Sequence, residues 1–322
     1  MNKDDLILSV RNLKTFFPSG NSWFGKQQYI KAVNDVSLDI KRNEVVGLVG
    51  ESGSGKTTLG RSILRLVKTN SGEIIFNGKD IVTMKNKELK DMHQKMQLIF
   101  QDPYGSLNPR MQIRKIIAEP LLLHKMVPKN MVEERVTELL KEVGLEPYFK
   151  DRYPHEMSGG QRQRIAIARV LGLQPQLIIA DEAVSSLDVS VTAQILNLLK
   201  TIQRENDMSM LFISHDLKVI SHISDRIMVM YEGQIVEKAT TKALLENPLH
   251  PYTKLLIASI PGHQKRTVIK KTRKHVNLTN LLSVKVGCPF VDRCPESKAI
   301  CNESNPLIKE SKRGQFVACH FN

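Results

Sequence analysis

The sequence predicts an α/β fold with a largely parallel sheet, an inserted helical subdomain and a small irregular C-terminal extension that contains cysteines. The first observation is a series of short apolar runs flanked by Gly, Asp or Ser, which is typical of buried parallel strands. The clearest runs cover residues 45–49, 96–100, 177–180 and 210–213. Stretches with helical spacing separate these runs, among them residues 131–143 and 191–205. Of the 322 residues, 41% are hydrophobic and 25% are charged, which suits a chain with a sizeable core.

Two breaks in this pattern predict the domain organisation. The span from about residue 102 to 170 is long and mostly helical, and we expect it to form the subdomain inserted between two strands. The composition changes near Pro261, where a basic segment begins that leads to a tail holding all four cysteines. We therefore place a first domain at residues 1–260, and a linker with a C-terminal extension at residues 261–322.

The chain is basic, with 47 Lys and Arg against 33 Asp and Glu and a net charge of +14. This excess suits an anionic partner, such as nucleotide phosphates, nucleic acid or an anionic membrane face, without choosing among them. The segment from Pro261 to Lys285 contains several Lys and Arg and no acid, which favours a solvated linker over a docking patch. No run reaches the roughly 18 apolar residues of a membrane span, and the N-terminus lacks a signal-peptide pattern. We expect an intracellular chain.

A glycine-rich segment directly after the run at residues 45–49 fits the phosphate-binding pattern G-x-x-x-x-G-K-[ST]. Its glycines let successive backbone N–H groups turn inward around phosphates, aided by the N-terminus of the following helix. Lys56 is expected to reach the β- and γ-phosphates, and Thr57 to ligate magnesium. The predicted phosphate-binding residues are Gly50, Glu51, Ser52, Gly53, Ser54, Gly55, Lys56, Thr57 and Thr58.

Two acids end the apolar run at residues 177–180. Asp181, at the carboxyl end of the predicted strand, is placed to hold magnesium through water. Glu182 is then placed to polarise an attacking water molecule. In a chain that also carries a phosphate-binding loop, this pair is the favoured site for nucleotide hydrolysis.

A third motif, residues 157–164, reads Met-Ser-Gly-Gly-Gln-Arg-Gln-Arg and precedes a predicted helix. Its Ser and Gly residues form a small helix N-cap that can bind an anion. Together with the loop and the Asp-Glu strand, this motif resembles the LSGGQ signature of the ATP-binding subunits of ABC transporters, with Met157 in place of Leu. The resemblance implies a P-loop nucleotide-hydrolase core of the ABC type. It also implies contacts to ATP held by an opposing subunit, made by Ser158, Gly159, Gly160, Gln161 and Asp188.

Other segments follow in the order of that family. Gln101 resembles the Q-loop glutamine, which senses magnesium and contacts the membrane subunit, and residues 185–188 resemble the D-loop. His215 resembles the switch histidine near the γ-phosphate. The resemblance thus implies catalytic roles for Glu182, His215 and Gln101, and magnesium binding by Thr57, Gln101 and Asp181. Ala183 replaces the proline usual in the family, which removes no functional group, so we expect hydrolysis to survive.

The family also stacks adenine on an aromatic residue upstream of the phosphate-binding loop. Phe17 fits this position best, with Tyr29 as the rival. An insertion at residues 18–28 separates the two, and the sequence leaves both open.

Segments outside the core resemble the peptide branch of the family, which imports oligopeptides, dipeptides or nickel. They are residues 100–110, 187–190, 247–254 and 259–261, while residues 60–65 and 104–106 look more like the F-type than the D-type ATPase subunit. The resemblance implies a peripheral protein at the cytoplasmic face of the cell membrane that uses ATP and Mg²⁺. Its implied partners are a second, different ATPase subunit in a nucleotide-sandwich dimer, two membrane permeases and an extracellular solute-binding protein, with no nucleic acid.

Two rival functions remain. A soluble ABC-type ATPase acting on nucleic acid suits the net charge, but such proteins usually carry paired cassettes or a long coiled coil, and this chain has one cassette and no heptad run. An exporter ATPase is disfavoured by the tail that resembles peptide importers.

The four cysteines, Cys288, Cys294, Cys301 and Cys319, have the spacing C-x5-C-x6-C-x17-C. Disulfides are disfavoured in a reducing cytosol, and structural zinc usually shows tight C-x2–4-C pairs. Four thiolates on a loop-rich tail suit an iron–sulfur cluster, and some relatives with a similar tail carry a four-iron cluster. We favour a [4Fe–4S] cluster over reduced thiols and zinc. The tail holds too few apolar residues to form a stable core without a cross-link of this kind.

Overall fold

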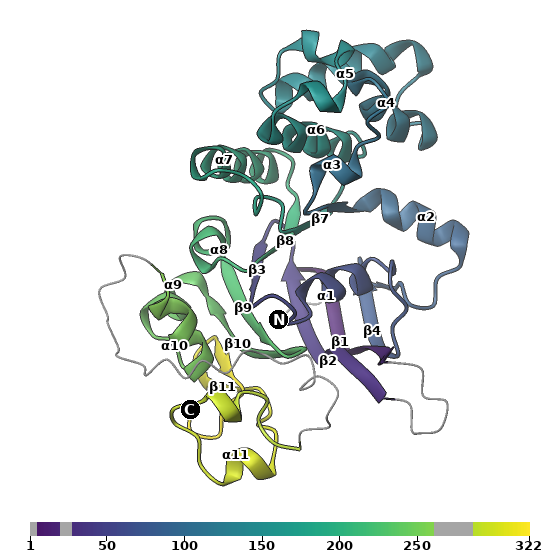
Figure 1. Cartoon of the computed structure of the whole chain (residues 1–322). Helices are drawn as coiled ribbons and strands as arrows, with labels where there is room; N and C mark the ends of the chain where they lie inside the picture. Colours follow the sequence, from purple (N-terminus) through teal and green to yellow (C-terminus); the bar gives the residue numbers. More distant parts are fainter. Residues whose placement is uncertain (1–4, 20–27, 261–285) are drawn as a thin grey trace. The chain divides into compact units, whose positions relative to one another are not determined.

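The computed structural model describes residues 5–19, 28–260 and 286–322, and these form two compact units (Figure 1). Unit 1 is drawn from residues 1–40, 45–82 and 214–322, and unit 2 from residues 41–44 and 83–213. The chain therefore leaves unit 1 after the first part of the core and returns to it for the C-terminal part. The basic segment from Pro261 to Lys285, and the choice between linker and docking patch, lie outside the described residues.

Unit 1 contains an antiparallel sheet with the strand order β2-β1-β4-β5. It also contains the strand series β11-β12-β10-β9-β3, in which β3 and β9 are parallel and the other neighbours antiparallel. The strands are β1 (Leu6–Ser19), β2 (Gln28–Lys41), β3 (Val45–Val49), β4 (Ser71–Phe76), β5 (Lys79–Asp80), β9 (Arg226–Tyr231), β10 (Gln234–Thr240), β11 (Lys309–Lys312) and β12 (Gln315–Val317). The helices are α1 (Lys56–Ile63), α8 (Leu217–Ile223), α9 (Thr241–Glu246), α10 (Pro251–Ala258), the 3₁₀ turn η6 (Val291–Arg293) and α11 (Ile300–Glu303).

Unit 2 contains the parallel strands β6, β7 and β8 and most of the helices that the structure describes. Its elements are α2 (Asn86–Lys95), β6 (Met96–Ile99), α3 (Pro103–Ser106), α4 (Ile113–Leu123), η2 (Lys129–Met131), α5 (Val132–Glu142), η3 (Pro147–Asp151), η4 (Pro154–Glu156), α6 (Gly159–Leu171), β7 (Leu177–Asp181), α7 (Val189–Glu205) and β8 (Ser209–Ser214). Within the described residues, no helix is both long and apolar enough to span a membrane.

The predicted core strands are confirmed. Every residue of β3, β7 and β8 is buried, which explains why these segments read as continuous apolar runs rather than alternating ones. The predicted helices are confirmed as α5 and α7, whose buried residues recur three and four positions apart. In α7 the apolar ones are Ile195, Leu196, Leu199 and Ile202.

Two parts of the fold were not predicted. The long strands β1 and β2 belong to an antiparallel sheet, and the alternation of buried Leu8 and Val10 with half-buried Ser9 and Arg11 is typical of a strand packed on one face. The C-terminal extension was expected to be irregular, but β11 and β12 add strands to β10 there.

Candidate functional site

The phosphate-binding loop joins β3 to α1, and glycine is required at its end. Gly55 is the N-cap of α1 and has a φ of 102°, a conformation that residues with a side chain rarely adopt. A Cβ atom at Gly55 would lie 2.0 Å from the carbonyl oxygen of Ala32, and one at Gly50 would lie 2.2 Å from that of Met230. The loop is therefore packed directly against other backbone segments of unit 1, which fixes its path.

Lys56 is the buried cation of this loop, with 4% of its surface exposed. Its ammonium group donates hydrogen bonds to the carbonyl oxygens of Gly50 at 2.8 Å and Glu51 at 2.9 Å. The loop is closed further by a hydrogen bond of 3.1 Å from the N–H of Ser54 to the carbonyl oxygen of Glu51. A positive charge is thus held inside a ring of backbone groups at a helix N-terminus, which is the arrangement that binds phosphate.

The remaining predicted residues of the loop lie in the same ring or on the first turn of α1. Gly53 has a φ of 81° and open space around its Cα, and Ser52 beside it is exposed. Thr57 and Thr58 follow Lys56 on α1 and are half-buried. Thr57 therefore reaches solvent at the helix N-terminus, where a magnesium ligand is required.

The predicted catalytic pair lies at the end of β7 in unit 2. Asp181 is the last residue of β7 and is 4% exposed. Glu182 has a φ of 48°, in the left-handed region that costs a non-glycine residue of order 1–3 kcal/mol. Its N–H donates to the carbonyl oxygen of Ile213 at 2.9 Å, which holds this strained conformation in place. Such strain, maintained beside a buried carboxylate, is typical of functional sites.

Gln101 lies next to Glu182. Its Nε2 atom donates a hydrogen bond of 3.1 Å to Oε2 of Glu182, although 81 residues separate the two along the chain. The turn after Glu182 is closed at Ser185, whose N–H and hydroxyl donate to the carbonyl oxygen of Glu182 at 3.1 and 3.0 Å. Ala183, buried at 2% exposure, fits this turn without the proline that the family usually has.

The signature motif forms the N-terminus of α6. The hydroxyl of Ser158 accepts from the N–H of Gln161 at 3.3 Å, and the side chain of Gln161 accepts from the N–H of Ser158 at 2.9 Å. This reciprocal capping box leaves Ser158 exposed and Gly159 half-exposed. The helix end is therefore well ordered, and its polar groups are accessible to a ligand.

The D-loop packs against this helix end. Asp188 caps α7 by accepting from the N–H of Val191 at 2.9 Å and from the Ser190 hydroxyl at 2.7 Å. These bonds, that from Val191 first, lower the pKa of Asp188 below its ordinary value. A Cβ atom at Gly160 would lie 2.5 Å from Cγ1 of Val191. Glycine at position 160 thus permits the close approach of α6 and α7, and a Cβ atom at Gly159 would lie 3.4 Å from Leu187 of the D-loop.

The remaining predicted site residues, His215 and the two candidate aromatics, are exposed. His215 is exposed between β8 and α8. Phe17 on β1 and Tyr29 on β2 are 38% and 46% exposed, so both aromatic rings are available for stacking. The insertion between them lies mostly outside the described residues, and the choice between the two aromatics stays open.

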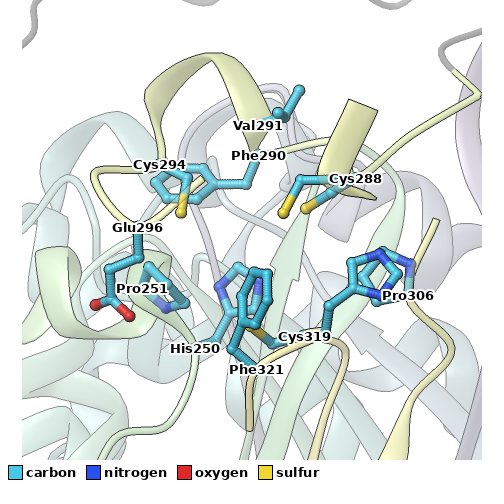
Figure 2. Close-up of a pocket in the computed structure, with 12 residues that line it drawn as sticks. His250, Pro251, Cys288, Phe290, Val291, Cys294, Glu296, Pro306, Cys319 and Phe321 are labelled. Carbon is cyan, nitrogen blue, oxygen red and sulfur yellow. The ribbon is translucent and has the colours of Figure 1, made fainter. Parts of the chain in front are cut away.

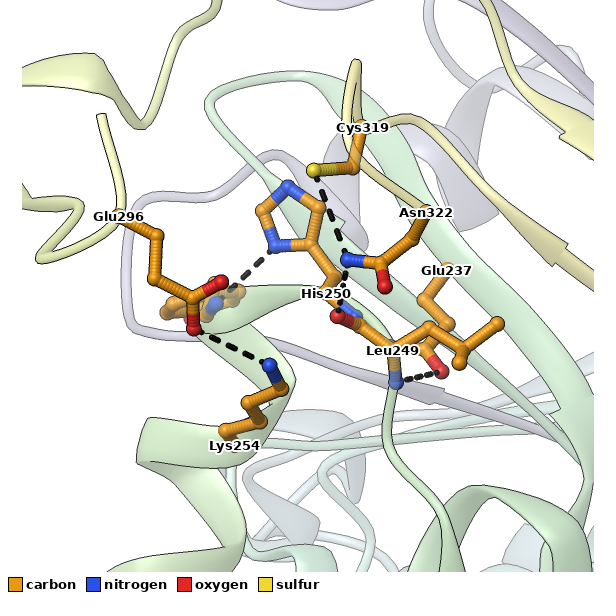
Figure 3. Close-up of polar contacts among 8 residues, drawn as sticks. Glu237, Leu249, His250, Lys254, Glu296, Cys319 and Asn322 are labelled. Atoms are coloured by element: carbon orange, nitrogen blue, oxygen red, sulfur yellow. Dashed lines mark hydrogen bonds and ion pairs between the residues drawn. The ribbon is translucent and has the colours of Figure 1, made fainter. Parts of the chain in front are cut away.

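Near the C-terminus, a buried carboxylate holds several distant segments together (Figure 3). Glu237 on β10 is fully buried and accepts from the N–H groups of Leu249 at 2.9 Å and His250 at 2.8 Å. It also accepts from Nε2 of Gln315 on β12 at 3.0 Å. Asn322, at the chain end, donates to the carbonyl oxygen of Leu249 at 3.0 Å. These bonds fasten the start of α10 and the C-terminal strands to β10.

The four cysteines line one pocket (Figure 2). All are free thiols, and the backbone N–H of Cys288 donates to the carbonyl oxygen of Cys301 at 2.8 Å. Burial raises the pKa of Cys288 to about 11 and also raises the pKa of Cys294, so these thiols carry protons at neutral pH. Among the residues that the structure describes, no group of three or more His, Cys, Asp and Glu side chains is arranged to hold a metal ion.

Sequence reasoning missed three residues that join segments of unit 1 distant in the sequence, two at the phosphate-binding loop and one at β10. The Tyr252 hydroxyl accepts from the N–H of Glu51 at 2.9 Å, and Arg293 forms two hydrogen bonds of 2.8 Å with the carboxylate of Glu51. The third is Glu237, with its three donors. Arg293 stands 242 positions from its partner, and no local pattern marks such a pair.

Comparison with known proteins decides the family. The model of the ABC transporter family matches residues 33–185, and the model of the oligopeptide/dipeptide transporter C-terminal region matches residues 236–301. The chain is 48% identical over 321 residues to the oligopeptide transport ATP-binding protein AppF of Bacillus subtilis (strain 168), covering 98% of both chains. The chain belongs to the ABC transporter ATPases. Within this family, it is also 47% identical over 318 residues to the putative oligopeptide transport ATP-binding protein YkfD of the same organism, covering 98% of this chain and 95% of YkfD.

Solved structures of ABC transporter ATPases agree with the fold. A dimeric ATP-binding cassette in a post-hydrolysis state, bound to ADP and Pi, matches 73% of this chain and 98% of its own, with a TM-score of 0.65 and 28% identity. The cbiO1 subunit of a Clostridium perfringens ABC transporter complex matches 76% of this chain and 92% of its own, with a TM-score of 0.66 and 29% identity. These relatives are transport proteins and ATP-binding cassettes, so the nucleic-acid alternative is not supported.

Proposed function

We propose that this chain is the ATPase subunit of an importer for peptides, or for a related solute such as a nickel complex, in which ATP binding and hydrolysis drive uptake. The observation that carries this proposal is the similarity to AppF over nearly the full length of both proteins. That similarity includes the ATP-binding motifs and the C-terminal region found in oligopeptide and dipeptide transporters.

ATP binding is assigned to residues 50–58, with adenine on Phe17 or Tyr29. The buried ammonium of Lys56 and the glycine conformations of the loop support this assignment. Lys56 exchanges its bonds to loop carbonyls for the β- and γ-phosphates, which replaces neutral acceptors by charged ones. Thr57, Gln101 and Asp181 are the proposed magnesium ligands, and the ion, when bound, neutralises charge on the phosphates.

Hydrolysis is assigned to Glu182, assisted by Gln101 and His215. The left-handed backbone of Glu182 and the hydrogen bond from Gln101 support a carboxylate held in one orientation. Glu182 accepts a proton from the attacking water. Gln101 orients the Glu182 carboxylate through its hydrogen bond and would be among the residues that hold the magnesium ion when it is bound. His215 donates to the γ-phosphate.

The similarity to oligopeptide transport ATP-binding proteins supports the following proposed partners and location. Ser158, Gly159, Gly160, Gln161 and Asp188 contact ATP held by a second ATPase subunit, which we propose to be a different chain. Two membrane permeases and an extracellular solute-binding protein complete the transporter, and this chain lies peripherally at the cytoplasmic face of the membrane. We keep residues 1–260 as the nucleotide-binding domain, with a helical subdomain at about 102–170, and residues 261–322 as the linker and C-terminal extension.

The sandwich is tested by Gly159→Asp. This substitution places a carboxylate where the γ-phosphate of the opposing site would lie, and like charges oppose closure. ATP should still bind to residues 50–58 of the variant, while transport should stop. Asn86→Asp adds a carboxylate at the exposed first residue of α2, and it is the control that should transport normally. Normal transport by Gly159→Asp would refute the trans contact.

We also propose that the four cysteines hold a [4Fe–4S] cluster with a structural role. Their convergence on one pocket supports this ligand set, and cluster formation requires their sulfur atoms to move closer together. ATP hydrolysis needs no electron transfer, so the expected role is order. Anaerobically purified protein should be brown, absorb near ~400 nm and contain about four irons per chain. Stoichiometric zinc in colourless protein, or no metal, would refute the cluster.

The proposed function is tested by uptake. Cells that lack this chain should fail to take up a labelled oligopeptide, and the wild-type chain should restore uptake. Glu182→Gln should not restore it. Full peptide uptake in cells that lack the chain, with loss of a different solute, would overturn the assignment to peptides.

A further inference from the structure

The C-terminal extension contacts the phosphate-binding loop through one two-point ion pair. Nη1 and Nη2 of Arg293 lie 2.8 Å from Oε2 and Oε1 of Glu51, respectively. The two side chains are 20% and 36% exposed, so water screens the pair only in part. Two parallel N–H···O bonds between guanidinium and carboxylate fix distance and orientation together, which a lysine at this position cannot do.

Arg293 is itself held by aromatic rings. Its guanidinium carbon lies 5.7 Å from the ring centres of both Tyr231 and Phe290, a distance at which cation–π attraction acts. Phe290 is almost fully buried and also contacts the ring of Tyr252 at 5.4 Å. The side chain of Arg293 therefore has little freedom, and its end is directed to the loop.

Glu51 connects Arg293 to Lys56 of the phosphate-binding loop. Its N–H donates to the Tyr252 hydroxyl, and its carbonyl oxygen accepts from Nζ of Lys56 at 2.9 Å. The same residue is thus bound to α10, to Arg293 and to the lysine that we assign to the phosphates. A change at Arg293 reaches Lys56 through a single residue.

The cysteine pocket determines where Arg293 lies. Arg293 ends the short turn η6, and the residues before and after this turn include Cys288 and Cys294. The N–H of Val291 donates to the carbonyl oxygen of Cys288 at 3.1 Å, and the N–H of Cys294 donates to that of Val291 at 3.3 Å. Cys288, Phe290 and Cys294 all line the pocket (Figure 2). Opening the pocket would therefore displace the turn that carries Arg293.

We infer that the C-terminal cysteine module, residues 286–322, is a positioning element of the ATP site, and that Arg293 raises the affinity of the loop for ATP by neutralising and orienting Glu51. Glu51 brings a carboxylate to a loop that must accept several phosphate charges. Unpaired, this carboxylate would repel ATP. When the Glu51 carboxylate is paired with Arg293, its charge is neutralised and the pair fixes the position of the loop. The inference rests on the proposed role of residues 50–58 in ATP binding.

The test is the dissociation constant for Mg·ATP, measured by titration calorimetry on the full chain. Arg293→Gln should raise the Kd about 10-fold, within the usual range for coupling between adjoining sites and reduced by partial screening. Arg293→Lys keeps the charge without the two-point geometry and should raise the Kd by less, about 3-fold. In a Glu51→Gln background, Arg293→Gln should change the Kd by less than about 3-fold, because no carboxylate remains for Arg293 to neutralise.

Matched controls separate this role from general stability. Lys254→Gln breaks the 3.1 Å ion pair to Glu296 in the same module without touching the loop, and it should leave the Kd unchanged. Cys294→Ser should weaken ATP binding in the wild-type chain but add nothing to Arg293→Gln. Thermal unfolding of each variant reports folding independently of the Kd.

The inference fails if Arg293→Gln binds Mg·ATP as tightly as wild type, or if Arg293→Gln raises the Kd by the same factor with and without Glu51→Gln. Lys56→Ala keeps the two tests distinct. Loss of binding in Lys56→Ala together with normal binding in Arg293→Gln would preserve the proposed ATP site and overturn only the role of the module. Normal binding in Lys56→Ala would instead overturn the ATP site itself.

Discussion

The phosphate-binding loop and the cysteine module both belong to unit 1, but they differ in the sequence separation of the residues that hold them in place. Lys56 closes the loop by binding carbonyl groups five and six residues away. Arg293 and Gln315 bind carboxylates 242 and 78 residues away. A contiguous motif therefore specifies the loop, whereas the module is placed only by the folded chain. We expect substitutions in the ATP motifs to change chemistry first, and substitution of the buried anchor Glu237, which binds Gln315 of the module, to change folding first.

Glu182→Gln is the strongest test of the expectation that substitutions in the ATP motifs change chemistry rather than folding. The amide keeps the size of the side chain but is a far weaker base, so ATP turnover by the assembled transporter should fall roughly 10²–10⁴-fold. Calorimetry should show ATP binding close to wild type, and the melting temperature should hardly change. Glu205→Gln, at the exposed end of α7, is the control and should keep full turnover. Wild-type turnover in Glu182→Gln would remove this residue from the mechanism.

Substitution of Glu237 tests the expectation that losing a buried anchor destabilises the fold. Glu237→Ala leaves three buried N–H donors without their acceptor, and we expect the free energy of unfolding to fall by about 3 kcal/mol. Urea denaturation of the purified chain measures this loss. Glu310→Ala removes an exposed carboxylate that accepts one hydrogen bond, from Gly314, and it should cost less than about 1 kcal/mol. Equal losses in the two variants would contradict an anchoring role for Glu237.

A smaller effect separates the two glycines of the signature motif. A Cβ atom at Gly160 would lie 2.5 Å from Val191, whereas one at Gly159 would lie at an ordinary 3.4 Å from Leu187. Gly160→Ala should therefore cost about 1–3 kcal/mol of stability through overpacking. Gly159→Ala should be neutral or slightly stabilising, because alanine favours helix. Chemical denaturation compares them, and a loss confined to Gly159→Ala would show that the contact between α6 and α7 is not as described.

The core strands and the ATP motifs could be predicted from the sequence because each is a local pattern with one physical interpretation. The apolar run from Leu177 to Ala180 can only be a buried segment, and the glycines around Lys56 leave few alternatives to an anion-binding turn. No local pattern predicts the hydrogen bond from Gln101 to Glu182. Family resemblance placed the two residues in one site, and the structure brings them within 3.1 Å.

The anchors could not be predicted because their partners lie far apart and their residue types are common. Glu237 looks like any glutamate in an exposed strand, yet it is fully buried, because β12 and the start of α10 supply its donors. The antiparallel pairing of β1 with β4 was missed for a similar reason, since register across that distance depends on tertiary packing.

The most direct test of the whole account is to measure peptide uptake and ATP hydrolysis together on proteoliposomes that contain the assembled transporter and its solute-binding protein. Labelled peptide should accumulate only when ATP reaches the face occupied by this chain, and Glu182→Gln should lower uptake and hydrolysis in parallel. Uptake at the wild-type rate by a Glu182→Gln transporter that no longer hydrolyses ATP would disprove the coupling of hydrolysis to transport.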